Sequence, residues 1–352
     1  MSFGYRRSRV LAAFAIGALL LAACGDDGGD GDGATGGTDA TGSTGATGST
    51  GEGIRVAVLL PGTPSDQGYN ADGQRAADAI ESELGAEVTV TESVPVPNQT
   101  DVYRQFAGQG FDLVIGWGGQ FTDGAVAAAE EFPDVNFLVV NSGVENGTNL
   151  ASVQQNSQDW QFVAGYALAK LSESGKIGLI GSQCFPGTAL TINGTAEGAR
   201  AANPDIDITI TYTGDFEDPT GAQQAAQAMI DEGVDAISGN ANNAWFGVFE
   251  AAESAGIPVI TEWVDNSELA PDVIASSVLK SQADFVTEIA RDVQEGEFEG
   301  KIYITEIVEG SGPAISDTDL LPDDVYDEAL DIQAQIESGE LDPPADESCP
   351  NQ

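Results

Sequence analysis

The feature that most constrains the fold is an alternation of short β-branched runs with longer amphipathic segments, which begins at residue 54. Apolar runs rich in Val and Ile indicate strands, whereas apolar residues three to four apart among good helix formers predict helices. Strands that alternate with helices predict a parallel sheet with helices on both faces. In the first half we expect strands buried on both faces at 54–60, 87–94, 111–117 and 135–141, and helices near 70–84, 98–108 and 121–131.

The same alternation restarts after the segment NLASVQQNSQDW at 149–160. Two doubly wound α/β lobes in tandem are the simplest account of a chain of 352 residues. The later segments, with strands at 273–278 and 301–307 and helices at 281–295 and 324–338, could return to either lobe. For the second lobe we expect helices near 159–173, 189–202, 219–232 and 244–255, and strands at 176–182, 207–213, 234–240 and 257–263.

The first residues indicate export from the cytoplasm. Arg6, Arg7 and Arg9 precede an apolar run at 10–23 that ends in LAAC, the order of a signal peptide with its cleavage site. LAAC resembles the bacterial lipobox, so residues 1–23 are predicted to be a lipoprotein signal and Cys24 the lipidated anchor on the cell membrane; the alternative is an ordinary signal peptide with a chance cysteine. The Gly, Asp and Thr residues of 24–53 predict a disordered linker.

Charge and composition exclude several classes of function. The net charge is −45, and only nine of the 12 Lys and Arg residues follow the signal, so the chain repels nucleic acid. The absence of histidine removes His-based triads and His-ligated metal sites. We therefore expect no catalytic residues, no metal and no cofactor.

The cysteines fit an extracytoplasmic protein. Lipidation of Cys24 would leave Cys184 and Cys349, an even pair in an oxidising compartment. A disulfide between these two residues is predicted, with two free thiols as the alternative.

Rings, amides and acids follow the predicted strands, where composition alone would predict Gly, Ser and Asp. Ligands of open parallel sheets bind beyond the carboxyl ends of the strands. Any one of these rings could instead cover the core, but together they suit a planar, polar small molecule, because rings stack on it and amides orient it. The residues in these loops are Asp66, Tyr69, Asn70, Trp117, Phe121, Asn141, Phe185, Phe216, Asp218, Asn240, Asn242, Asn243, Trp245, Glu262, Trp263 and Asp265.

A succession of segments resembles the basic membrane protein family of extracytoplasmic lipoproteins. They are DQGYN, FDLVIGWGGQFTDGAVAAAEEFPDVNFLVVN, FVAGYALAKLSESGKIGLIGS, NPDIDITITYTGDFEDPTGAQQAAQAMIDEGVDAISG, APDVIASSVLK and QIESGELDPP, which together span nearly all of 54–343. The resemblance implies the type I periplasmic-binding-protein fold and a receptor, expected to be a monomer, that delivers a nucleoside or similar solute to an ABC permease.

The resemblance also implies the domain boundaries and the site. Three crossings near 152–158, 273–280 and 305–310 would join a first lobe of 54–153 plus 281–305 to a second lobe of 158–275 plus 308–352. By position, the ligand loops would contain Asp66, Tyr69, Asn70, Trp117, Gly118 and Phe216, with Lys280 at the second crossing.

Two departures from the family pattern concern the ligand. Asn141 stands where relatives usually have Asp. Trp263 replaces the aspartate expected to hold ribose hydroxyls, and only Asp265 of that acidic pair is kept.

Three alternatives remain open at this point. A receptor for another sugar-like or aromatic solute, or a surface sensor without a transporter, would use the same fold. A hydrolase could pair Asp66 with Asp218 or Asp265 as acid and base, but no nucleophile motif, metal-ligand spacing or phosphate loop accompanies these acids.

Overall fold

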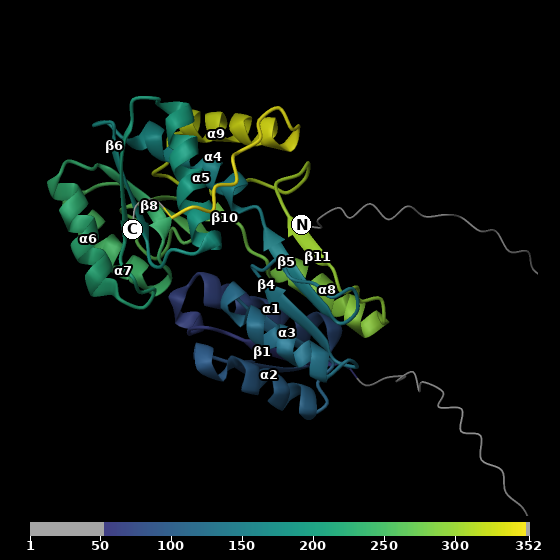
Figure 1. Ribbon diagram of the computed structural model, residues 1–352. Helices are drawn as coiled ribbons and strands as arrows, with labels where there is room; N and C mark the ends of the chain where they lie inside the picture. Colours follow the sequence, from purple (N-terminus) through teal and green to yellow (C-terminus); the bar gives the residue numbers. More distant parts are fainter. Residues whose placement is uncertain (1–52, 350–352) are drawn as a thin grey trace, which may run out of the picture. The chain divides into compact units, whose positions relative to one another are not determined.

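The computed structural model of this chain describes residues 53–349 (Figure 1). The predicted signal, the linker up to residue 52 and the anchor Cys24 lie outside the described residues. Within 53–349, every pair of neighbouring strands in the two sheets is parallel. The predicted α/β class with two parallel-sheet lobes is confirmed.

The first sheet has the strand order β11-β5-β4-β3-β1-β2 and helices on both faces. On one face, α1 (Tyr69–Leu84) and α8 (Ala283–Glu295) bury side chains such as Ile80 and Val286. On the other face, α2 (Gln99–Gly108) and α3 (Thr122–Glu131) bury side chains such as Phe106. The strands are β1 (Arg55–Leu59), β2 (Glu87–Thr91), β3 (Leu113–Trp117), β4 (Asn136–Val140), β5 (Leu150–Gln155) and β11 (Ile302–Thr305).

The second sheet has the order β10-β9-β8-β6-β7 and is covered in the same way. One face packs on α4 (Ser157–Leu171), α5 (Pro186–Ala202) and α9 (Asp323–Glu337). The other face packs on α6 (Pro219–Asp231) and α7 (Trp245–Ala255). The strands are β6 (Lys176–Gly181), β7 (Asp207–Tyr212), β8 (Ala236–Asn240), β9 (Val259–Trp263) and β10 (Ile274–Leu279).

The chain passes between the two sheets after β5, after β10 and after β11. The last passage ends beside the second sheet, where Ile315 forms an antiparallel bridge with Val278. Strand β11 therefore joins the first sheet from late in the chain, as Figure 1 shows by its yellow-green colour beside the teal β5.

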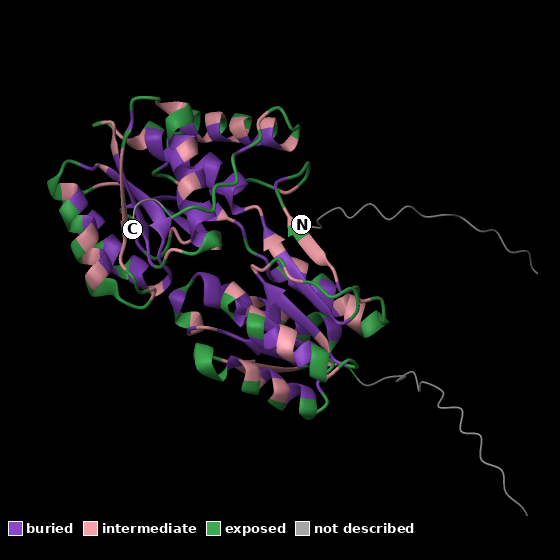
Figure 2. Cartoon of the chain, viewed as in Figure 1, coloured by how far each residue is buried: buried purple, intermediate pink, exposed green. Residues whose placement is uncertain are grey.

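Two expectations about strands were wrong. Strand β5, LASVQQ, was not predicted, because its Ser and Gln side chains hide a strand whose Ser152 is nonetheless fully buried between β4 and β11. Strand β2 is not buried on both faces but half-buried, because it lies at the edge of its sheet. Figure 2 shows the contrast between the buried central strands and the exposed outer faces of the helices.

The C-terminal tail is tied to the second lobe. Cys184, just before α5, forms a disulfide with Cys349, and their Cα atoms are 5.9 Å apart. Asn193 donates from Nδ2 to the carbonyl oxygens of Asp346 and Ser348 at 2.8 and 2.9 Å. Within residues 53–349, no helix combines the length and the apolar character that crossing a membrane requires.

Candidate functional site

The corner after β1 is built around the carboxylate of Asp66. Its Oδ1 accepts the backbone N–H groups of Gly68 and Ala71 at 3.0 Å, and its Oδ2 accepts the backbone and side-chain N–H groups of Asn70 at 2.8 and 2.7 Å. Asn70 in turn accepts the backbone N–H of Gly62 at 2.9 Å. Because a carboxylate stabilises the N–H groups that a helix start leaves unpaired, Asp66 and Asn70 fix the beginning of α1.

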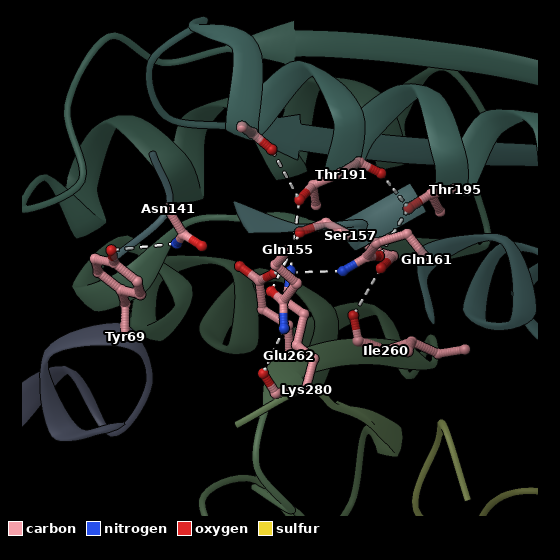
Figure 3. A network of polar contacts seen from close by, with 12 residues as sticks. Tyr69, Asn141, Gln155, Ser157, Gln161, Thr191, Thr195, Ile260, Glu262 and Lys280 are labelled. Carbon is pink, nitrogen blue, oxygen red and sulfur yellow. Dashed lines mark hydrogen bonds and ion pairs between the residues drawn. The ribbon is translucent and has the colours of Figure 1, made fainter. Parts of the chain in front are cut away.

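The corner places the ring of Tyr69 at the first residue of α1. The ring centroid lies 6.2 Å from that of Trp117 and 4.9 Å from that of Trp263. The hydroxyl accepts a 3.2 Å hydrogen bond from Nδ2 of Asn141 (Figure 3). Oδ1 of Asn141 accepts from Nε2 of Gln282 at 2.9 Å. Burial raises the pKa of the Tyr69 phenol, so its hydroxyl stays neutral.

Trp263 joins the two lobes. It ends β9 of the second sheet, yet its ring packs in the core cluster of the first lobe beside Tyr69. Its φ of 83° lies in the left-handed region, which costs a bulky residue about 1–3 kcal/mol. The packing of Trp263 against Tyr69 and over Lys280 offsets this strain.

A buried ion pair lies behind Trp263. Glu262 Oε2 is 2.7 Å from Nζ of Lys280, and each side chain is only 1% exposed. Nζ also lies 3.4 Å from Oγ1 of Thr191 and 4.4 Å from the ring centroid of Trp263, while Nε2 of Gln161 donates to Glu262 Oε2 at 3.4 Å (Figure 3). Lys280, which was expected to bind the ligand, is thus surrounded by partners from the protein.

The second carboxylate oxygen of Glu262 is not paired. Oε1 is buried and has no hydrogen-bond partner within residues 53–349. The Lys280 ammonium, the Trp263 indole and the Asn240 amide are near enough to favour the charged form, but the latter two make no well-aligned bond to this oxygen. Burial is the larger effect, and it raises the pKa of Glu262.

A hollow lies between the corner after β1 and the second lobe. Its empty volume is about 280 Å³, a figure that includes its opening to solvent. The rings of Trp245 and Phe249 stack in its wall with centroids 5.8 Å apart. We call this space the interlobe hollow; it is lined by Asp66, Gly68, Asn242, Trp245, Phe246, Phe249, Glu262, Trp263, Asn266 and Leu269.

Other predicted site residues lie around the interlobe hollow without lining it. Trp117 is fully buried in the first lobe, where it contacts Tyr69. Gly118 has a φ of 137° after β3, where a Cβ would lie 2.3 Å from Oε1 of Gln120. Asn240 ends β8 beside Glu262.

Three further predicted residues do not line the interlobe hollow. Phe185, which is 42% exposed, and Phe216 form a ring pair with centroids 6.2 Å apart. Asp265 is exposed and accepts the backbone N–H of Ser267 at 3.0 Å. Of the acids considered for hydrolysis, Asp66 lines the interlobe hollow and Asp265 does not, while Asp218 caps the start of α6.

The sequence analysis placed Glu262 in a ligand loop but gave it no role of its own, and it did not select Phe249, Phe246 or Asn266, although all four line the interlobe hollow. A signal for Glu262 was present, because a charge inside an otherwise apolar strand is buried only with a partner. Lys280, at the end of the neighbouring apolar run, was the available cation. The rings of α7 gave no such signal, since apolar residues at helical spacing usually form core.

A family model described as ABC transporter substrate-binding protein PnrA-like matches residues 54–347. A purine-binding protein of Brucella abortus is 28% identical over 83% of this chain and 83% of its own length. An ABC transporter nucleoside-binding protein of Lactococcus lactis is 26% identical over 73% of this chain and 77% of its own.

The fold is shared with solved solute-binding proteins. One from an ABC transporter system of Aeropyrum pernix superimposes with a TM-score of 0.76 at 23% identity, covering 83% of this chain and 94% of that chain. Within residues 53–349, no group of three or more Cys, Asp or Glu side chains is arranged to hold a metal ion.

Proposed function

The chain belongs to the Bmp family of PnrA-like ABC transporter substrate-binding proteins, and on that premise we propose that it binds a nucleoside or free purine in the interlobe hollow. The family is one of solute-binding proteins and not of enzymes. The names of the relatives from Brucella abortus and Lactococcus lactis support a purine or nucleoside ligand. The observation that carries the proposal is the meeting of Tyr69 and Trp263, rings from opposite lobes, beside this hollow.

The rings are proposed to hold the ligand by stacking. Tyr69 and Trp263 would separate when the lobes open, and a planar ligand would enter against one or both rings before the lobes close. Closure by hinge motion would use the three passages between the sheets. A purine stacked on a ring gains about 1–3 kcal/mol, and the amide of Asn242, which lines the interlobe hollow, would orient it.

The remaining predicted residues have supporting roles in this proposal. Asp66 and Asn70 set the position of Tyr69, Asn141 orients its hydroxyl, and Trp117 and Gly118 form the wall behind it. Lys280 and Glu262 form the floor beneath Trp263. Phe185, Phe216 and Asp265 would contact a ligand only at the rim.

The transport role has two further proposed parts. Substrate-binding proteins of ABC importers act outside the cytoplasm, and we propose that Cys24 anchors this one to the cell membrane through a lipid. The closed form is proposed to act as a monomer that docks on a permease. Replacement of Cys24 with Ser should release the protein into the soluble fraction, and unchanged membrane association would contradict the anchor.

Binding can be tested directly. The small molecule released on denaturation of the freshly purified protein should have the mass of a purine or nucleoside. Calorimetry with adenosine, guanosine, inosine and their free bases should then give a dissociation constant, and chromatography should recover intact nucleoside. Failure of every purine to bind would remove the nucleoside assignment, and release of free base would indicate a hydrolase.

A further inference from the structure

The unpaired oxygen of Glu262 bears on which ligand the interlobe hollow accepts. Glu262 is 2% exposed and lines this hollow, and its Oε1 lacks a hydrogen-bond partner within residues 53–349. A buried acceptor without a donor destabilises the protein, and more so when it is charged. A ligand that supplies the donor would recover this free energy.

The geometry around Glu262 determines which oxygen remains available. Lys280 and Gln161 both hold Oε2, and neither lines the interlobe hollow. The ammonium of Lys280 can only donate hydrogen bonds. The backbone oxygen of Lys280 accepts from Nε2 of Gln155 at 2.9 Å, which helps to fix the position of the residue. Oε1 is therefore the oxygen left for a molecule in the hollow.

The other acid of the hollow does not compete for this donor. Asp66 already accepts four N–H groups of its own corner. The remaining lining is formed by rings, by the amides of Asn242 and Asn266, and by Gly68 and Leu269. Glu262 is thus the charged acceptor of the hollow with free capacity.

We propose that the interlobe hollow selects planar ligands that present an N–H donor on the ring edge to Oε1 of Glu262, and that it rejects ligands with only acceptors or C–H groups there. This inference rests on the proposed function. Ring N–H groups and exocyclic amino groups both satisfy it. Because a hydrogen bond to a charged acceptor is among the stronger ones, we expect a preference of about tenfold to a hundredfold.

Two matched ligand pairs test the proposal on the wild-type protein by calorimetry. Adenosine carries a 6-amino group that purine riboside lacks, and inosine carries an N1–H that 1-methylinosine lacks. In each pair the donor-bearing ligand should bind more tightly. Equal binding within both pairs would overturn this inference alone, whereas no binding by any of the four would overturn the proposed function and this inference with it.

The variant Glu262→Gln sharpens the test. Lys280 can only donate, so the introduced amide must turn its oxygen to Lys280 and its NH₂ group to the interlobe hollow. The adenosine preference over purine riboside should then fall to within about threefold. The control Glu253→Gln makes the same change on the exposed surface of α7 and should keep the wild-type preference.

A loss of stability in Glu262→Gln would not obscure the outcome, because a ratio of affinities is measured on folded protein and the wild-type ligand pairs stand alone. A wild-type preference that persists in Glu262→Gln would show that another group accepts the donor, and it would overturn the proposal.

Discussion

Two buried carboxylates from opposite lobes line the interlobe hollow, but they differ in whether their oxygens have hydrogen-bond partners. Asp66 accepts four hydrogen bonds from the corner that carries it. Glu262 contacts Lys280 and Gln161 through Oε2, and its Oε1 has no hydrogen-bond partner within residues 53–349. An acid beside a ligand site can therefore belong to the scaffold or to the site, and counting its donors distinguishes the two.

The largest effect is expected from removing the partner of Glu262. Lys280→Met leaves a buried carboxylate without its ammonium, which should lower the free energy of unfolding by about 3–5 kcal/mol in urea denaturation. A much smaller loss is expected for the double variant Glu262→Leu with Lys280→Met, because replacing both charges removes the unpaired group. Equal losses in the two variants would show that the pair contributes through packing alone.

The next effect concerns the corner of Asp66. Asp66→Asn replaces one carboxylate oxygen with an NH₂ group, which donates and cannot accept. Whichever oxygen is replaced, two N–H groups of the corner lose their acceptor. We expect the free energy of unfolding to fall by about 1.5–3 kcal/mol. The preference for donor-bearing ligands should persist, since it depends on Glu262. A variant of full stability that loses this preference would assign Asp66 to the ligand and erase the contrast.

The third prediction concerns Tyr69, whose position depends on Asp66. Tyr69→Leu should weaken ligand binding by about 1–3 kcal/mol through lost stacking. Tyr69→Phe keeps the ring and loses only the contact with Asn141, so calorimetry should find binding near the wild-type level. A large loss in Tyr69→Phe would mean that the hydroxyl, not the ring, holds the ligand.

Sequence alone predicted the fold well, because each central strand is an apolar run and each helix has its own spacing of apolar residues. It missed β5, whose Ser and Gln side chains are buried by neighbouring strands that lie far away in sequence. The loops after the strands place Tyr69 beside Trp263, and they place Trp245 and Trp263 in the lining of the same hollow.

The chemistry of the acids could not be predicted in the same way. Asp66 accepts four hydrogen bonds because of the backbone dihedrals of the turn that follows it. Glu262 keeps one oxygen unpaired because Lys280, which follows a neighbouring strand, contacts the other. Both properties arise from pairings that composition and spacing do not encode.

A third buried acid, Asp159, extends the comparison away from the hollow. It lies in the first turn of α4, next to the passage that follows β11. Burial raises its pKa to about 7, opposed by the backbone N–H of Ile307 and assisted by the nearby charges of Glu306 and Asp342. Unlike Glu262, it lies among other acids, so it retains its proton where an exposed Asp would lose it.

The smallest predicted effect follows from this proton. Between about pH 4, where an unfolded Asp ionises, and about pH 7, where folded Asp159 does, the folded state binds more protons, so its stability falls as pH rises. After solvent screening we expect this loss to be about 1–2 kcal/mol, complete above pH 7. Asp159→Asn keeps an oxygen for Ile307 and removes the titration, so its free energy of unfolding should match the wild type at pH 4 and exceed it at pH 8. Asp342→Asn is the matched control, because it removes a neighbouring charge and leaves the Asp159 proton in place. Parallel stability curves for wild type and Asp159→Asn between pH 4 and 8 would show that Asp159 is already ionised in the folded protein.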